Sequence, residues 1–118
     1  MAGPLTLSLV DPQDRRAMAE VHALWARLYR DDPAWVPPLA EWLRRRLAPS
    51  NSFFRQAELR LFLARRGSQD VGSISALRDH QHEQHRGEAA AFFGFFETQD
   101  DPAVAALLLE RAADEARG

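Results

Sequence analysis

Several absences in this 118-residue sequence narrow the chemistry that the protein can perform. There is no cysteine, so disulfides, thiolate nucleophiles and cysteine-bound metals are excluded. Fifteen basic residues against seventeen acidic ones leave a net charge of −2, which offers no positive field for nucleic acid or anionic lipid. No apolar run reaches the length of a membrane span, and no charged leader opens the chain. We therefore expect a soluble, cytoplasmic protein with no nucleic-acid and no membrane partner.

The histidines do not predict a metal site either. His80, His82 and His85 form an H-x-H-x-x-H pattern in a polar loop. A zinc site needs ligands that converge on one centre and a second shell that orients them, and this loop places no further ligand to complete such a set. Solvated loop histidines, with adventitious metal binding as the alternative, are the simpler interpretation. We expect no metal.

The composition that remains is that of an ordinary globular protein. Hydrophobic residues make up 46% of the chain and charged residues 27%, and the length suits one compact domain. We expect residues 1–118 to belong to a single domain.

The first thirty residues predict a strand followed by a helix. Residues 5–10 alternate leucine with other side chains, which is typical of a strand with one apolar face that includes Leu9. Asp11 and Pro12 then resemble an N-cap and the first helical position, where the missing N–H of proline costs nothing. Apolar residues at helical spacing continue to about Arg30.

The middle of the chain predicts a short helix and a β-hairpin. A proline-rich turn leads into a helix at about 39–47. From Glu58 the apolar period becomes two, and Gly67 occupies a loop position typical of a left-handed residue. Residues 71–79 form the return strand, whose small side chains suit close packing of another element.

The last third predicts an aromatic strand at about 89–97 and a final helix. Asp101 and Pro102 repeat the cap-and-proline pair at the start of that helix. The complete order is β-α-α-β-β-β-α, which indicates an α+β fold with a mostly antiparallel sheet and helices packed on it.

The aromatic strand, FFGFFE, raises a question of its own. A strand that is apolar on both faces must be covered on both faces, and a strand at a sheet edge carries backbone groups that invite pairing. A ligand, a second chain or further polypeptide must therefore lie beside Phe92–Phe96.

Three stretches of the sequence resemble the opening of a GNAT-type N-acyltransferase, in a bacterial subgroup of that superfamily. They are LYRDDPAWVPPL, FFRQAELRLFLARRGSQDVGSISA and HQHEQHRGEAAAFFGFFETQDDPAVAALLLE. The resemblance covers nearly the whole chain but only the N-terminal half of the acyl-CoA N-acyltransferase fold. It implies an incomplete GNAT-like domain that uses acetyl-CoA or another acyl-CoA as co-substrate.

In that fold the fourth strand splays from the fifth, and the pantetheine arm of acyl-CoA lies in the gap. The resemblance places Phe92, Phe93, Phe95 and Phe96 along the acyl channel. Gly94 allows close approach, and free backbone groups at a strand edge can pair with the pantetheine amides.

The resemblance departs from the family at the loop that cradles the pyrophosphate. Gln99 matches the first position of the usual Q/R-x-x-G-x-G/A loop, whose N–H groups bind the anion. Asp100 and Asp101 instead bring negative charge, and Pro102 removes an N–H where the family has glycine. A carboxylate within about 5 Å of a phosphate costs about 1–3 kcal/mol near a protein surface. We expect this loop to bind pyrophosphate poorly.

The resemblance also suggests a general base and a substrate-binding residue. Glu97 ends the aromatic strand, where many GNAT enzymes hold a carboxylate that takes a proton from the amine; a solvated strand-end carboxylate is the alternative. Trp35 lies in the turn that borders the acceptor site in such folds, or simply pins that turn. The tyrosine that often serves as general acid falls outside the resemblance, and Tyr29 does not match it.

Two functions follow as hypotheses. In the first, the chain belongs to an acyltransferase that moves an acyl group from acyl-CoA to a small-molecule or peptide amine. In the second, it is a non-catalytic interaction module, a homodimer that pairs through the Phe92–Phe96 strand.

Overall fold

The computed structural model describes residues 3–37, 40–48, 50, 57–79 and 91–117. Its elements follow the predicted order and an α+β architecture: β1 (Leu5–Val10), α1 (Arg15–Leu28), α2 (Ala40–Arg46), β2 (Ala57–Arg66), β3 (Gln69–Asp79), β4 (Ala91–Thr98) and α4 (Pro102–Arg117). The predicted fold class is confirmed.

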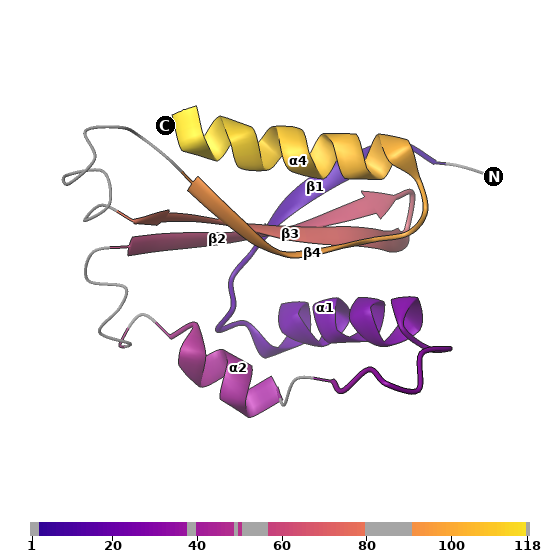
Figure 1. Cartoon of the computed structure of the whole chain (residues 1–118), viewed down its shortest axis with the longest axis horizontal. Helices are drawn as coiled ribbons and strands as arrows, with labels where there is room; N and C mark the ends of the chain where they lie inside the picture. The colour runs from indigo at the N-terminus through magenta and orange to yellow at the C-terminus, as the bar shows by residue number, and fades with distance from the viewer. Residues whose placement is uncertain (1–2, 38–39, 49, 51–56, 80–90, 118) are drawn as a thin grey trace.

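The strands form one antiparallel sheet in the order β1-β2-β3-β4 (Figure 1). The turn between β2 and β3 places Gly67 at φ 63°, a left-handed conformation that glycine adopts without steric cost, as predicted. Because β4 pairs only with β3 among the described strands, it lies at an edge of the sheet.

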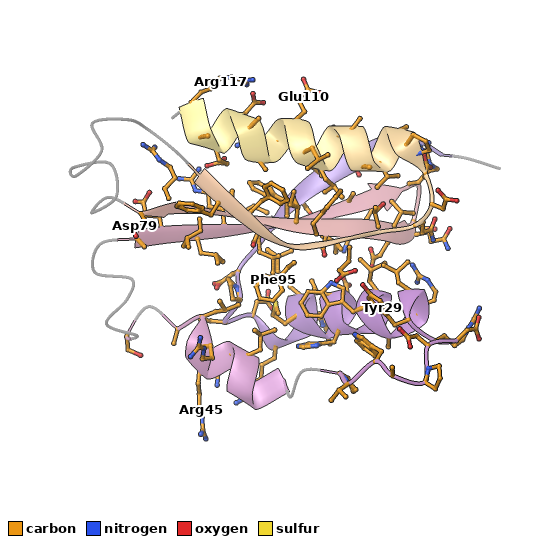
Figure 2. All side chains as sticks on the ribbon, viewed as in Figure 1. Tyr29, Arg45, Asp79, Phe95, Glu110 and Arg117 are labelled. Carbon is orange, nitrogen blue, oxygen red and sulfur yellow. The ribbon has the colours of Figure 1, made fainter. Side chains whose placement is uncertain are left out.

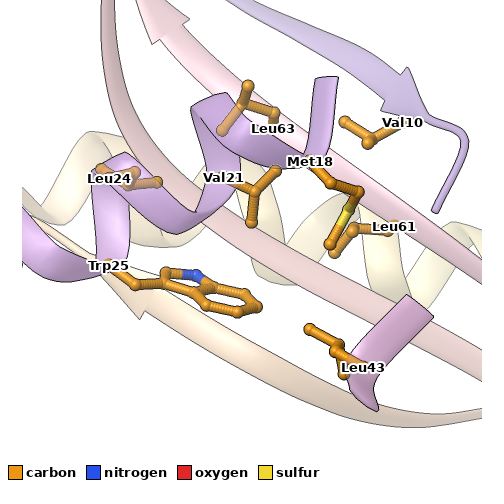
Figure 3. Packing of buried hydrophobic residues seen from close by; sticks show 8 residues of the cluster. All are labelled: Val10, Met18, Val21, Leu24, Trp25, Leu43, Leu61 and Leu63. Carbon is orange, nitrogen blue, oxygen red and sulfur yellow. The ribbon is translucent and has the colours of Figure 1, made fainter. Parts of the chain in front are cut away.

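Helices cover both faces of the sheet and form two separate cores. In Figure 1, α4 lies on one side, and α1 and α2 lie on the other. Figure 3 shows the core on the α1 side, which we call the α1 core: Val10, Met18, Val21, Leu24, Trp25, Leu43, Leu61 and Leu63. The α4 core contains Phe62, Ala64, Val71, Ile74, Ala76, Val104, Leu108 and Ala112. Adjacent residues of β2 therefore serve opposite cores, as the period of two predicts.

Helix α4 packs closely on β3 because a glycine lies beneath it. A methyl group added at Gly72 would lie 2.9 Å from Leu108 Cδ1 and 3.0 Å from Val104 Cγ1. The small residues of β3 thus set the distance between helix and sheet, which confirms the expectation of close packing.

One local prediction is wrong. Helix α1 begins at Arg15 rather than after Asp11, because the side chain of Asp14 caps it by accepting hydrogen bonds from the amides of Arg16 and Ala17. Asp11 instead holds a turn, accepting from the Gln13 amide at 2.9 Å. Leu9 is 62% exposed, because α4 lies mainly over β3 and β4 and leaves this face of β1 open.

None of the helices in the described part of the chain is long and apolar enough to cross a bilayer.

Candidate active site

Strand β4 contains a β-bulge in the middle of the aromatic run. Ser75 pairs with Gly94, but Ser73 pairs with Glu97, so Ile74 stands opposite two residues, Phe95 and Phe96. Phe95 has φ 47°, and no other non-glycine residue of the described ranges has a positive φ. Left-handed backbone at such a residue costs about 1–3 kcal/mol and is concentrated at functional sites, as are bulges.

The bulge distributes the phenylalanines over both faces of the sheet. Phe95 packs on the α1 core and Phe96 on the α4 core. Phe93 contacts Phe96 edge to face, with ring centroids 6.2 Å apart, although three residues separate them. In a regular strand, residues three apart face opposite sides, so the extra residue of the bulge explains this pair. Phe92 and Phe93 remain 51% and 61% exposed.

A chain of hydrogen bonds holds the bulge from beneath. The indole Nε1–H of Trp25 donates to Ser73 Oγ at 2.9 Å, and the Ser73 hydroxyl donates to the carbonyl oxygen of Phe95 at 2.7 Å. The ring of Phe95 stacks on Trp25 with centroids 5.4 Å apart. Ser73 is fully buried, and both of its contacts are satisfied. This polar connection fixes the unusual backbone of Phe95.

Beside the bulge lies a hollow of about 90 Å³ that is lined by Trp25, Tyr29, Trp35, Phe95 and Glu97. Figure 2 shows Tyr29, the C-cap of α1, and Phe95 on β4 at this region between helix and sheet. The phenol of Tyr29 donates a hydrogen bond to Glu97 Oε2, and its ring stacks on Trp35 at a centroid distance of 5.3 Å. The lining is thus aromatic, with a single carboxylate.

The hydrogen bond to Glu97 raises the pKa of Tyr29, and burial and the charges of Glu97 and Asp32 act in the same direction. The phenol is protonated at neutral pH in any case, and the raised pKa lets it remain a donor to the carboxylate at more alkaline pH. Tyr29 therefore fixes the orientation of Glu97.

Two larger hollows lie on other parts of the surface. One, of about 320 Å³, contacts Pro12, Leu47 and Leu59; the other, of about 380 Å³, contacts Leu9, Phe62 and Arg111. Neither is lined by a residue of β4. The small hollow is the better candidate because it combines a strained backbone, a carboxylate held by a fixed donor, and an edge strand.

In the predicted pyrophosphate loop, the side chain of Asp101 caps the start of α4. The carboxylate of Asp101 accepts a hydrogen bond from the Ala103 amide at 3.0 Å and pairs with Arg66 Nη2 at 3.0 Å. Burial acts to raise the pKa of Asp101, but the bonds from the Ala103 amide and Arg66 outweigh it and lower the pKa. The carboxylate of Asp101 thus lies at the start of α4. The backbone N–H of Gln99 donates a hydrogen bond to Val71 O at 3.1 Å.

Comparison with solved structures identifies the fold. The chain superimposes on a tandem GNAT protein from the clavulanic acid biosynthesis pathway with a TM-score of 0.72 and 18% identity, covering 97% of this chain and 33% of that one. An aminoglycoside acetyltransferase from an uncultured soil metagenomic sample, solved with sisomicin, matches with a TM-score of 0.65 and 12% identity over 96% and 70% of the two chains. The chain has a GNAT-type fold. It corresponds to the N-terminal half of that fold, as predicted.

Curated proteins extend the comparison by sequence. The chain is 40% identical over 116 residues to the bacterial ceramide synthase of Caulobacter vibrioides, which covers 95% of this chain and 30% of that protein. It is 34% identical over 85 residues to protein YghO of Escherichia coli K12, covering 72% of this chain and 22% of that protein. The chain thus spans less than a third of the length of these relatives. No protein-family model matches it.

Within the GNAT-type fold, the structure brings together only some of the predicted site residues. Glu97, Phe95 and Trp35 line the same hollow. Phe96 faces the α4 core, Phe93 is exposed, and Gln99 follows the end of β4. Their roles toward a ligand stay predictions.

Sequence reasoning missed Trp25 and Tyr29. Trp25 lies on the apolar stripe of α1, where helical spacing alone marks it as a core residue, and Tyr29 is the C-cap that follows this helix. The one available signal was that Tyr29 is the single tyrosine and lies next to the proline-rich turn.

The histidine motif at 80–85 and the side chain of Trp42 lie outside the described residues. Among the residues that are described, no group of histidine, aspartate and glutamate side chains is arranged to hold a metal ion.

Proposed function

We propose that this chain supplies the acceptor side of an N-acyltransferase, which moves an acyl group from a pantetheine thioester to a primary amine. The proposal rests on the position of Glu97. This residue lies near the end of the bulged edge strand β4 and lines the aromatic hollow, and the Tyr29 phenol donates a hydrogen bond to its carboxylate. A carboxylate at the end of an accessible strand is suited to take a proton from an amine that attacks a thioester lying along that strand.

The relatives suggest which amine is the acceptor. A protein with 40% identity is named a ceramide synthase, and a ceramide is the N-acyl derivative of a long-chain 2-amino alcohol. We propose that the acceptor belongs to this class, an amine on an aliphatic chain. Because the chain spans 30% of that protein, the reaction is proposed for the encoded polypeptide at its full length.

The proposed reaction forms one bond and breaks one. Glu97 accepts a proton from the ammonium group and releases it to solvent, and the freed amine nitrogen attacks the thioester carbonyl. The C–N bond forms, and the C–S bond breaks with its electron pair on sulfur. The nitrogen gives its second proton to Glu97, which passes it to the thiolate and returns to the carboxylate. Phe93, Phe95 and Phe96 would contact the acyl donor along β4, whose edge can pair with pantetheine amides.

The remaining residues of the hollow fit a cationic head group. Aromatic rings attract ammonium ions by about 0.5–2 kcal/mol each, and a carboxylate adds a charge-assisted hydrogen bond. Trp35 belongs to the turn after α1, and its ring forms one side of the hollow. Tyr29 is a positioning residue for Glu97. The amine would therefore enter between this turn and β4.

Replacement of Glu97 tests the proposal. With an acyl-CoA and a long-chain 2-amino alcohol, the encoded polypeptide should produce the amide, and Glu97→Gln should lower kcat by about 10²–10⁴-fold, the usual contribution of general base catalysis. Glu110→Gln, the same change at an exposed site on α4, should retain full activity. Full activity of Glu97→Gln, or no amide from the unmodified protein, would refute the proposal.

A second candidate function is favoured by the exposure of the β4 edge. Phe93 is 61% exposed on a strand that ends the described sheet, so a second copy could pair with β4 across a twofold axis. Sedimentation at tens of micromolar should then show a dimer that Phe93→Lys converts to a monomer. A protein that sediments as a monomer before any substitution excludes this homodimer.

A further inference from the structure

The N-terminus of α4 has nearly all of its amide groups engaged within the chain. The Gln99 N–H donates to Val71 O at 3.1 Å, and the Asp101 N–H donates to Gln99 O at 2.7 Å. The Ala103 amide donates to the Asp101 carboxylate at 3.0 Å, and the Ala105 amide donates to the Asp101 carbonyl oxygen at 3.1 Å. Pro102 has no N–H. Anions bind at helix N-termini because free N–H groups point outward there. At the start of α4, most of these N–H groups already donate to acceptors within the chain.

The charges around this helix start are equally unsuited to an anion. Asp100 and Asp101 place two carboxylates where a pyrophosphate would approach. The nearby cation, Arg66, is paired with Asp101 at 3.0 Å. The Thr98 hydroxyl, the last side chain of β4, donates to Gln99 O at 3.0 Å. A phosphate at this point would meet repulsion and would find its donors already taken.

The edge of β4 presents the opposite situation. The bulge interrupts pairing with β3 at Phe95 and Phe96, and Phe93 remains exposed beside it. Backbone groups on this edge suit the two amides of a pantetheine arm, and the phenylalanines suit an acyl chain. Contacts for the reactive end of the donor are therefore available, whereas the described residues at the start of α4 offer none to its pyrophosphate.

We infer that this chain recognises its acyl donor through the acyl group and the pantetheine arm alone, without binding the pyrophosphate of CoA at α4. The inference rests on the proposed acyl transfer and defines its donor class as a pantetheine thioester, carried either by CoA or by the prosthetic arm of an acyl carrier protein. The transfer itself is unchanged: the C–S bond breaks, and the donor leaves as a free pantetheine thiol.

The experiment compares donors that share the reactive end and differ in the rest. Calorimetry on the encoded polypeptide measures Kd for octanoyl-CoA, for S-octanoyl-pantetheine and for an octanoyl-loaded bacterial acyl carrier protein. We expect the Kd values of octanoyl-CoA and S-octanoyl-pantetheine to differ by less than fivefold. The donor with the lower Kd, octanoyl-CoA or the octanoyl-loaded carrier protein, then identifies which molecule carries the pantetheine arm to this protein.

A variant pair tests whether the Asp101 cap is the cause. Asp101→Gly releases the amide of Ala103 and removes a carboxylate, so octanoyl-CoA should bind at least fivefold more tightly while S-octanoyl-pantetheine does not change. Asp114→Ala removes a carboxylate from the far end of the same helix, where it pairs with Arg117, and should change neither Kd.

The possible results separate the two proposals. Octanoyl-CoA that binds fivefold or more tightly than S-octanoyl-pantetheine overturns the inference and leaves the acyl transfer standing. An Asp101→Gly variant with unchanged Kd values also overturns it. If none of the thioesters binds, the proposed function has failed and the inference fails with it.

Discussion

The two faces of the sheet are built from different chemistry. The α4 core is wholly apolar, and its helix sits so close to Gly72 that a single added methyl group would collide with Leu108 and Val104. On the other face, the indole of Trp25 in the α1 core donates a hydrogen bond to the buried Ser73 of β3, and a hollow with a carboxylate lies beside them. The α4 face is packed tightly where the helix lies over β3, whereas the α1 face contains buried polar groups beside β4.

This difference indicates which face stabilises the fold and which serves function. Buried polar groups and a positive φ at phenylalanine reduce stability unless the surroundings compensate, and such features are concentrated where chemistry occurs. The tightly packed α4 face can supply that compensation. Substitutions on the two faces should therefore differ in what they disturb.

The largest effect on stability should come from the α4 core. Leu108 is fully buried, so Leu108→Ala should lower the free energy of unfolding by about 3 kcal/mol through lost burial and a cavity. The neighbouring Leu109 is 40% exposed, and Leu109→Ala should cost less than about 1 kcal/mol. Urea denaturation measures both values, and equal losses would contradict the assignment of this face.

A smaller loss should follow from removing the polar link on the α1 side. Ser73→Ala leaves the Trp25 N–H and the Phe95 carbonyl without their partner, which should cost about 1–3 kcal/mol. Ser8→Ala, the same change at an exposed serine whose bond to Leu63 O is long at 3.5 Å, should be nearly neutral. Equal denaturation midpoints for Ser73→Ala and the unmodified protein would show that the link does not stabilise the bulge.

The coupling of Tyr29 to Glu97 should appear as a shifted ionisation. Because Tyr29 is the single tyrosine, phenolate absorbance reports it alone, and its midpoint should lie above the ordinary value of 10. The folded state then holds the phenol proton more tightly than the unfolded state. This contribution to stability is present below pH 10 and is lost as pH rises through the folded pKa.

Removing the Glu97 charge should reverse that shift. Glu97→Gln should move the Tyr29 midpoint down toward 10, whereas Glu110→Gln should leave it unchanged. If the Tyr29 midpoint is the same in all three proteins, Tyr29 and Glu97 do not interact in solution.

The smallest effect should come from His22, whose ring packs edge to face on Trp25. Burial lowers its pKa below 6.5, so the unfolded chain takes up this proton first as pH falls. The folded state should therefore lose stability as pH falls through 6.5 toward the folded pKa. Denaturation midpoints measured at pH 8 and pH 5 should differ less for His22→Gln than for the unmodified protein. The same difference between the two pH values in both proteins would contradict this prediction.

The sequence predicted the order of elements because local rules determine most of them. Period-two leucines marked β2, and helical spacing marked α1 and α4. The same Asp-Pro pair nevertheless had two outcomes. Asp101 caps α4, whereas Asp11 forms a turn because Asp14 offers a competing cap three residues later. A dipeptide alone could not distinguish these cases.

The candidate site could be predicted only in part. Glu97 and Trp35 were accessible from the family resemblance, but the meeting of Tyr29 with Glu97 depends on how α1 lies across β4. The bulge was also hidden, since the letters FFGFFE are compatible with a regular strand. It arises from pairing with β3, where Ser73 bonds to the Phe95 carbonyl across the two strands.

The hydrogen bonds from Trp25 through Ser73 to Phe95 also connect the buried indole to the edge strand β4. Any compound that settles against β4 and shifts the Phe95 carbonyl must alter the environment of the Trp25 indole, which is 4% exposed and does not itself need to touch the compound. The indole N–H resonance of Trp25 should therefore report occupancy of β4 from the interior of the protein, with no attached label.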